Sequence, residues 1–396
     1  PNNVRYMANT TADRFNKDFA FQWQREDNRK VRNWKEFSDL FLSIPMAHRM
    51  ATNYMILDGT PNKQTLKVMR PYQVYATQRV IEKIKATDFE LGHNKIGYIW
   101  HTTGSGKTIT SFKTAWLASR LPNVDKVVFV VDRIALTKQT SENYKAYNPD
   151  EDIDFDNKGI QDTESTTILS RKLRNKGGGI IVTSVQKLGK LVSRASFKSP
   201  DKKIVFIVDE AHRSTSGDQF ADIQKAFKKA AWIGYTGTPM FDDTTKGLRT
   251  QDIFGDLLHH YTIRDAIADR NVLGFKVDFE TTIDEEKLKQ DYLPDYFKAQ
   301  YPNWTDQQIK DKIANMTAAD IDEKIPNNFY DNNAEHVKIV VEDIFDNWRN
   351  RSNDGRYNAM LTTHVGGGRA STPMAMQYFD EFQRKNAEQR EQVNLN

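Results

Sequence analysis

Short apolar runs alternate with longer amphipathic segments between about residues 96 and 236. The runs are IGYIW (96–100), VVFVV (127–131), IIV (180–182), IVFIV (204–208) and WIGY (232–235). Strands that lack polar alternation are covered on both faces, as in a parallel sheet. The intervening segments are long and periodic enough to form crossover helices, and they include 107–120, 133–147 and 217–229. We therefore predict an α/β fold built on a doubly wound parallel sheet.

The flanking segments follow other patterns. Apolar residues three or four apart predict an amphipathic helix near the start of the chain: Trp34, Phe37, Leu40, Phe41 and Ile44. A polar stretch from about 285 to 334 precedes a second amphipathic helix (335–349) and an apolar strand, YNAML (357–361). The predicted organisation is a helical lead-in (1–69), a main α/β lobe (70–275), a linker or insertion (276–334) and the beginning of a second α/β lobe (335–396).

Composition narrows the class of protein. The 396 residues are 38% hydrophobic and 28% charged, and no apolar run approaches the roughly 20 residues that a membrane span requires. The absence of cysteine excludes disulfides and thiolate metal sites. A net charge of +4 permits a polyanionic partner without identifying one.

A phosphate-binding loop is the first chemical signal. HTTGSGKT (101–108) follows a predicted strand and opens a predicted helix, which is the context such a loop needs. Gly104 and Gly106 let backbone N–H groups point into one concavity, and the helix N-terminus adds positive potential. Thr103 and Ser105 complete the predicted cradle, Lys107 is predicted to reach the β- and γ-phosphates, and Thr108 to hold Mg²⁺. The strict pattern has glycine where this chain has His101.

Adjacent carboxylates give the second signal. IVFIVDEAH (204–212) places Asp209 and Glu210 at the carboxyl end of a buried strand, where open α/β sheets bind ligands. Such a pair is costly without a compensating cation, which the Mg²⁺ of a nucleotide supplies. We predict that Asp209 faces the metal, that Glu210 polarises the attacking water, and that His212 senses the γ-phosphate.

The order of these and later motifs resembles the first RecA-like lobe of a superfamily-two helicase or translocase. The motifs are RPYQ (70–73), HTTGSGKT, VVDRIALTKQ (130–139), VTSVQKL (182–188), VDEAHRS (208–214) and GYTGTP (234–239). Together with FGDLLHHYTIRDAIADRNVLGF (254–275), they are similar to the motor subunit HsdR of type I restriction-modification enzymes. The lead-in FAFQWQREDN (19–28) resembles the segment that joins the nuclease of that subunit to its motor.

The resemblance implies further roles. Gln73 would read the adenine of ATP, with Tyr72 or Tyr75 stacking on the base. TGTP would couple the nucleotide state to the track through its first three residues, Thr236, Gly237 and Thr238. The loops after the second and third strands would grip one DNA strand by its backbone through Arg133, Lys138, Thr183, Ser184 and Gln186.

The implied function is ATP-driven translocation along double-stranded DNA in a bacterial or archaeal cytoplasm, without a membrane. Partners would be the modification (methyltransferase) and specificity subunits, and an upstream nuclease would cut the DNA. Asp278 with Glu285, Glu286 and Lys287 is a candidate for that nuclease, but TIDEEK (282–287) reads better as a capped helix start. Because the second lobe stops before the arginines that such a motor needs, we expect this chain alone to be weakly active or inactive. Alternatives are another superfamily-two helicase or remodeller, or a nucleotide-binding docking module without turnover.

Overall fold

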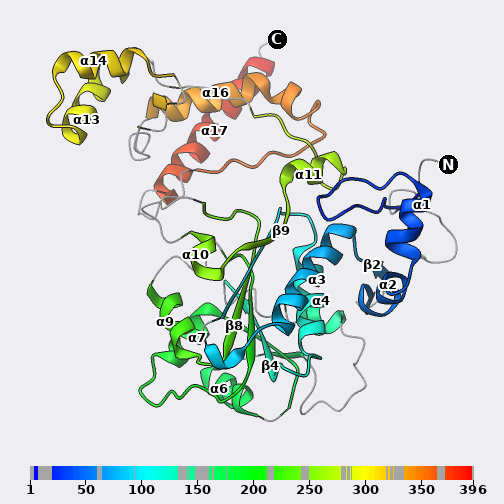
Figure 1. Cartoon of the computed structure of the whole chain (residues 1–396). Helices are drawn as coiled ribbons and strands as arrows, with labels where there is room; N and C mark the ends of the chain where they lie inside the picture. Colours follow the sequence, from blue (N-terminus) through cyan, green and yellow to red (C-terminus); the bar gives the residue numbers. More distant parts are fainter. Residues whose placement is uncertain are drawn as a thin grey trace. The chain divides into compact units, whose positions relative to one another are not determined.

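The chain forms two compact units, Pro1–Gly274 and Phe275–Asn396 (Figure 1). The computed structural model describes residues 4–7, 20–59, 65–92, 94–132, 140, 142–147, 160–162, 165–175, 177–211, 218–241, 249–277, 282, 286, 288–317, 320–321, 324, 334–363 and 371–394. None of the helices in these ranges combines the length and the hydropathy needed to cross a membrane.

A seven-stranded sheet forms the centre of the first unit, and all six of its strand pairs are parallel. Its strands are β3 (Asn94–His101), β4 (Lys126–Val131), β5 (Ile160–Asp162), β6 (Ile180–Ser184), β7 (Ile204–Val208), β8 (Ala230–Thr236) and β9 (Leu257–Tyr261). They run in the order β5-β6-β4-β7-β8-β3-β9. The five strands expected from the apolar runs are present, and the doubly wound parallel fold is confirmed. The short β5 and the partly polar β9 were not anticipated.

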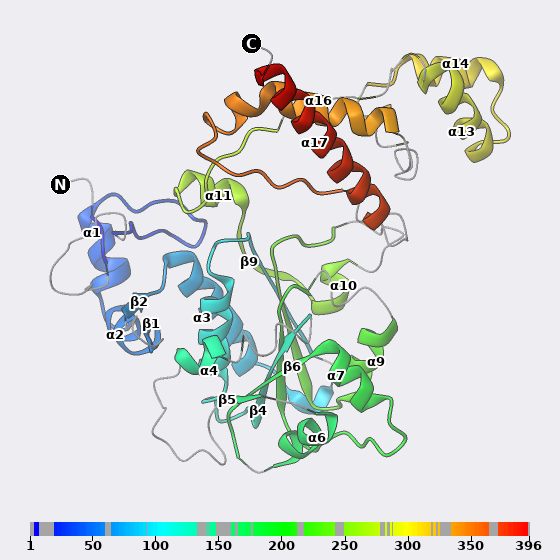
Figure 2. The same ribbon diagram turned by 180° about the vertical axis from the view of Figure 1, so that it is seen from behind.

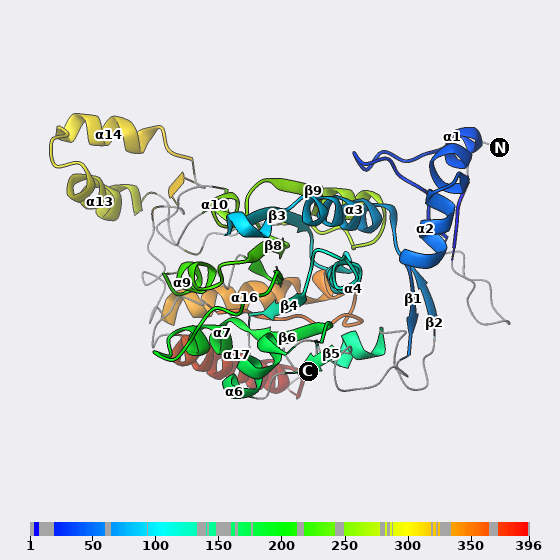
Figure 3. The same cartoon turned by 60° about the horizontal axis from the view of Figure 1, so that its bottom comes forward.

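Helices cover both faces of this sheet. On one face lie α3 (Pro71–Lys85) and α4 (Lys107–Ala118), and on the other α6 (Thr166–Arg174), α7 (Val185–Val192) and α9 (Asp218–Ala226). Figures 1 and 2, seen from opposite sides, place these two groups on either side of the strands, and Figure 3 shows the same layers from below. Every residue of β4, β6, β7 and β8 is buried, as the continuous apolar runs predict. The helix expected over 133–147 lies largely outside the described residues.

The lead-in packs beside α3 through an aromatic cluster around Trp23. It contains α1 (Trp34–Phe37), a π-helical turn η2 (Ser38–Leu42), α2 (Met46–Asn53) and a hairpin of β1 (Met55–Asp58) and β2 (Thr65–Val68). The amphipathic pattern over 34–44 is correct in its middle, where Phe37 is buried. It is wrong at its ends, because Trp34 is 51% exposed and Ile44 is 87% exposed. The remaining elements of the unit are η3 (Phe89–Leu91), α10 (Thr250–Phe254) and α11 (Ile263–Ala268).

The second unit is helical wherever it has regular secondary structure in the described ranges. It contains η4 (Leu288–Tyr292), α13 (Leu293–Gln300), α14 (Asp306–Ala314), α16 (Ala334–Arg351) and α17 (Ser371–Asn394). The predicted helix over 335–349 is present as α16. The predicted strand at 357–361 is wrong, because these residues pair with no strand in the described part of the chain and Met360 is 86% exposed. Without a neighbour to complete its ladder, an apolar segment cannot form a strand.

The stacked pair Phe206 and Trp232 offers a test of the core. Their ring centroids lie 4.0 Å apart between β7 and β8, and both side chains are buried. We expect Phe206→Ala to lower the free energy of unfolding by about 3 to 5 kcal/mol, measured by denaturant titration. Leu273→Ala is the control, because Leu273 is 90% exposed, and it should stay within about 0.5 kcal/mol of the unaltered chain. Equal effects of the two substitutions would contradict the assignment of this core.

Candidate nucleotide site

The phosphate loop lies between the end of β3 at His101 and the start of α4 at Lys107. Gly104 and Gly106 have φ values of 80° and 82°, a region that L side chains rarely adopt. A Cβ atom on Gly106 would also lie 2.7 Å from Nε2 of Gln73. Both glycines are therefore required by the backbone itself.

The first turn of α4 is open to a ligand. The first N–H groups of a helix have no partner within it, and none of the described side chains caps those of α4. Thr103 and Gly104 are exposed, and Thr108 is half-buried in the first turn. Uncapped N–H groups and the helix dipole together favour an anion at this point.

Ser105 contributes through its backbone. Its side chain is buried, and its Oγ donates to the carbonyl oxygen of Thr102 over 2.6 Å. The carbonyl oxygen of Ser105 accepts hydrogen bonds from the hydroxyl of Tyr72 (2.6 Å) and from Nε2 of Gln73 (3.1 Å). The loop is thus held from behind by two residues of α3.

Lys107 brings together three of the predicted motifs. Its Nζ lies 3.7 Å from Oε1 of Glu210, and a Cβ atom on Gly237 would lie 3.3 Å from the same Nζ. Thr236 is buried, and its Oγ1 accepts a hydrogen bond from the N–H of the exposed Thr238. The phosphate loop, the acidic pair and the TGTP segment therefore meet around one ammonium group.

Asp209 and Glu210 follow β7 directly. Burial, followed by the charge of Glu210, raises the pKa of Asp209 to about 6. The N–H of Glu210 donates to Oδ1 of Asp209 over 3.0 Å, and Glu210 itself has a φ of 48°. A strained backbone and a carboxylate disfavoured in its charged form are both costs that a site for a cation would explain.

The donors suit Mg²⁺. Asp209 and Thr108 offer hard oxygen ligands of the kind that Mg²⁺ prefers. In the described ranges no group of three or more histidine, aspartate or glutamate side chains is placed to hold a metal ion. Two protein donors fit an ion that takes its remaining ligands from phosphates and water.

Both ends of the amide of Gln73, the predicted adenine reader, already have hydrogen-bond partners in the protein. Oε1 of Gln73 accepts from the N–H of Arg70 over 2.8 Å, while its Nε2 donates to Ser105. Tyr75 is not placed to stack on a base, because its ring packs on Trp23 and its hydroxyl donates to the carbonyl of Gln24. Tyr72 stacks instead on Tyr261, at 3.6 Å between ring centroids. Adenine reading by Gln73 stays a prediction.

The predicted DNA contacts need correction. Thr183 and Ser184 have an exposed fraction of 0%, so neither presents a surface to a phosphate. Ser184 instead caps α7, its Oγ accepting from the N–H of Lys187. Nε2 of Gln186 donates to the carbonyl of Asp132 over 2.6 Å.

Several predicted residues cannot be placed. Arg133, Lys138 and His212 lie outside the described residues, as do three of the residues considered for a nuclease: Asp278, Glu285 and Lys287.

A buried histidine pair was not anticipated as part of the site. Nε2 of His101, the last residue of β3, lies 3.1 Å from Nδ1 of His259 in β9. Burial lowers the pKa of His101 well below its usual range and that of His259 to about 3, so both rings are neutral at pH 7. The register of β9 against β3 brings these rings together, and the apolar runs gave no signal for that strand.

The sheet order, the loop after β3 and the acidic pair after β7 define a RecA-like lobe of the superfamily-two helicase class. A protein-family model of SWI2/SNF2 ATPases matches residues 72–310. Because this match spans more than half of the chain, the chain belongs to the SWI2/SNF2 ATPase family.

Curated relatives are endonuclease subunits of type I restriction enzymes, which confirms that resemblance. The chain is 32% identical to the SsaAORF53P subunit of Staphylococcus saprophyticus, over 96% of this chain and 36% of the relative. It is 38% identical to the SauMSSORF170P subunit of Staphylococcus aureus, over 72% of this chain and 30% of the relative. The chain thus spans about a third of the length of these relatives.

Solved structures show more distant likeness. One is a nuclease-deletion mutant of the Type ISP restriction-modification enzyme LlaGI in complex with a DNA substrate mimic, at 15% identity and a TM-score of 0.37, covering 83% of this chain and 40% of that chain. Another is the SWI2/SNF2 ATPase core of Sulfolobus solfataricus in complex with dsDNA, at 15% identity and a TM-score of 0.37, covering 75% of this chain and 55% of that chain. The fold assignment rests on the sheet topology and the family match.

The raised pKa of Asp209 predicts a pH-dependent cost to stability in the absence of metal and nucleotide. The folded protein binds this proton more tightly than the unfolded chain, so stability falls as pH rises from about 4 to about 6 and stays lower above that. We expect Asp209→Asn to raise the free energy of unfolding at pH 8 by about 1 to 3 kcal/mol, with the difference closing by pH 4. Urea titrations across this range test it. The exposed Asp39→Asn serves as control, and a difference for Asp209→Asn that does not change with pH would contradict the prediction.

Gln73→Ala tests whether the Gln73 amide holds the phosphate loop, reads adenine, or does both. Since Nε2 holds the phosphate loop, we expect the substitution to weaken ATP and GTP binding alike, by about tenfold for a lost buried hydrogen bond. Competition of both nucleotides against a fluorescent analogue measures the two losses. A further loss confined to ATP would show that Gln73 also reads adenine. Unchanged affinity for both nucleotides would remove it from the site.

Proposed function

We propose that this chain binds ATP with Mg²⁺ and hydrolyses it to drive translocation along double-stranded DNA, as the motor part of a type I restriction endonuclease subunit. The observation that carries the proposal is the meeting of Lys107, Glu210 and Gly237 at the open N-terminus of α4. The SWI2/SNF2 family match and the restriction-enzyme relatives support it.

The residues divide the chemistry among them. Backbone N–H groups of the loop and the Lys107 ammonium neutralise charge on the β- and γ-phosphates, in positions fixed before the nucleotide arrives. Mg²⁺, held by Thr108 and Asp209, would neutralise further phosphate charge. Glu210 orients the attacking water, and its carboxylate lies 3.7 Å from the Lys107 ammonium.

Coupling to DNA begins at Gly237. Its carbonyl oxygen accepts from Nε1 of Trp100 over 3.0 Å, and a Cβ atom on Gly237 would lie 3.3 Å from Nζ of Lys107. A change in phosphate charge beside Lys107 would therefore act on the backbone of Gly237, which follows β8. We infer that this segment passes the nucleotide state to the DNA-binding surface, which includes Arg133 and Lys138. The modification and specificity subunits would position that surface on DNA.

Two substitutions test the site. In the intact subunit, we expect Lys107→Ala and Glu210→Gln to lower phosphate release with saturating DNA by about a hundredfold or more. Glu210→Gln should still bind ATP, because it removes water orientation and keeps the cradle. Lys190→Ala is the matched control, since Lys190 is an exposed lysine of α7, and it should turn over normally.

The same assay separates the alternatives. Turnover that DNA stimulates, and that falls as salt rises, supports a DNA motor. Nucleotide binding by the intact subunit without any turnover would instead favour a docking module. Normal turnover by Lys107→Ala would overturn the site.

A further inference from the structure

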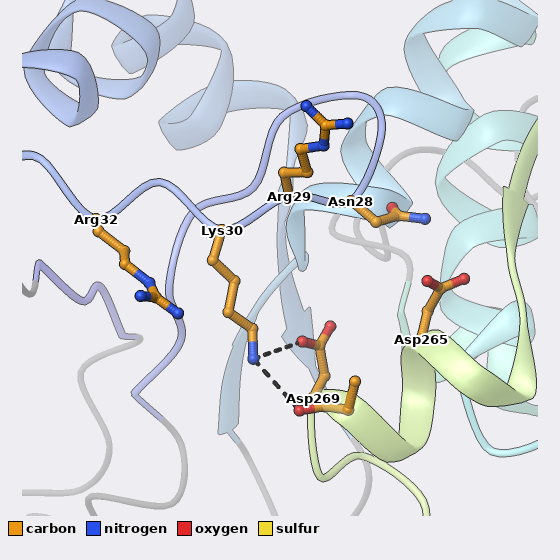
Figure 4. Close-up of a pocket in the computed structure, with 7 residues that line it drawn as sticks. Asn28, Arg29, Lys30, Arg32, Asp265 and Asp269 are labelled. Carbon is orange, nitrogen blue, oxygen red and sulfur yellow. Dashed lines mark hydrogen bonds and ion pairs between the residues drawn. The ribbon is translucent and has the colours of Figure 1, made fainter.

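A hairpin of the lead-in rests on the segment that follows β9. Residues 23–31, called here the lead-in hairpin, pair across Gln24 and Lys30, and their turn includes Asn28 at a φ of 65°. Figure 4 shows this hairpin beside α11, around an open cavity of about 390 Å³. Nδ2 of Asn28 donates to the carbonyl oxygen of His260 over 3.0 Å. The hairpin is thus tied to the end of the edge strand.

Asp269, which follows α11, contacts both the lead-in hairpin and the end of β9. Its Oδ1 lies 2.9 Å from Nζ of Lys30, and its Oδ2 accepts from Nε2 of Gln24 over 2.7 Å. The ion pair is drawn in Figure 4. The same Oδ2 accepts from the hydroxyl of Tyr261 over 3.0 Å. One carboxylate therefore joins the lead-in hairpin to an aromatic ring in the core.

The ring of Tyr261 is connected to the phosphate loop through Tyr72. Tyr261 and Tyr72 stack with ring centroids 3.6 Å apart and an angle of 8° between their planes, and both rings are buried. The hydroxyl of Tyr72 donates to the carbonyl oxygen of Ser105 over 2.6 Å. Burial raises the pKa of Tyr72 to about 12, so the hydroxyl keeps the proton that it donates.

The Ser105 carbonyl determines where the next N–H points. In a planar trans peptide the C=O of one residue and the N–H of the next point in opposite directions. Holding the Ser105 oxygen toward α3 therefore turns the N–H of Gly106 the other way, at a residue whose φ of 82° gives the loop its curvature. The Tyr72 hydroxyl therefore fixes the peptide group between Ser105 and Gly106.

We propose that Asp269 is a positioning residue for nucleotide binding, which orients Tyr72 through Tyr261 and is itself held by Gln24 and Lys30 of the lead-in hairpin. The proposal rests on the proposed function, because it concerns the same phosphate loop. Docking of the lead-in hairpin on Asp269 then raises the affinity of the loop for ATP. A segment outside the α/β lobe thus takes part in setting the nucleotide site.

The test compares four variants of the whole 396-residue chain: Tyr72→Phe, Asp269→Asn, the two combined, and Tyr98→Phe. Tyr98 is the matched control, because it is a buried tyrosine of β3 that packs on the sheet face covered by α6, α7 and α9, and not against α3 or the lead-in hairpin. Affinity is measured with a fluorescent ATP analogue and Mg²⁺. Hydrogen exchange of a peptide covering residues 101–110 is measured without nucleotide, and thermal unfolding checks the fold.

Tyr72→Phe keeps the stacked ring and loses only the hydroxyl, so we expect about tenfold weaker binding and faster exchange in the loop. Asp269→Asn should weaken binding severalfold when it is the only substitution. Added to Tyr72→Phe, it should have no further effect, because it acts through the hydroxyl that Tyr72→Phe removes. Tyr98→Phe should leave both readouts unchanged.

Three results would overturn the inference while the unaltered chain binds ATP. They are unchanged affinity in either single variant, Tyr72→Phe or Asp269→Asn, losses that multiply in the combined variant, and an equal loss in Tyr98→Phe. Failure of the unaltered chain to bind the analogue would overturn the proposed function, and the inference with it.

Discussion

Burial of a parallel sheet on both of its faces is the constraint on which the rest of this lobe depends. Every side chain of β4 and β7 must be apolar or satisfied within the core, because helices cover both faces. Polar chemistry is therefore confined to the ends of the strands. Since the strands are parallel, their carboxyl ends share one edge, and residues from β3, β7 and β8 converge there without being close in sequence.

The charged groups at that edge carry an electrostatic cost. Asp209 is buried beside Glu210, and its pKa of about 6 shows that its charged form is disfavoured. The Lys107 ammonium, which lies 3.7 Å from Oε1 of Glu210, offsets part of this cost. A cation brought with the nucleotide would offset the rest. The apolar core can tolerate such a cost, because the buried strands supply the stability that this edge does not.

The sequence reveals those parts of the site that depend on local pattern. The buried strands, the two glycines at positive φ and the acidic pair all follow from residue types at fixed spacing. The contacts that hold the phosphate loop from behind cannot be predicted from such spacing. The contact of Tyr72 with Ser105 joins residues 33 apart, and that of Gln24 with Asp269 joins residues 245 apart. Only the packing of α3, β9 and the lead-in hairpin brings them together.

Two failed predictions have the same origin. The apolar run at 357–361 indicates a strand, but a strand also requires a neighbour, and none of the described residues provides one. Polar side chains after β6 suggest a surface, but Ser184 turns inward to cap α7. Local pattern states what a segment is able to do, and tertiary contacts select among those options.

His101 shows why the first position of the phosphate loop tolerates a residue other than glycine. It is the last residue of β3, and it is not among the described residues with positive φ. A side chain there enters the core between β3 and β9, where it needs space and a polar partner. His259 supplies that partner over 3.1 Å, and because burial keeps both rings neutral, one can donate while the other accepts. Gly104 and Gly106 have no such freedom, because at their backbone angles a side chain would be strained whatever the space. The residue at position 101 is thus set by its neighbours in the core, whereas the glycines at 104 and 106 are required by the backbone conformation of the loop.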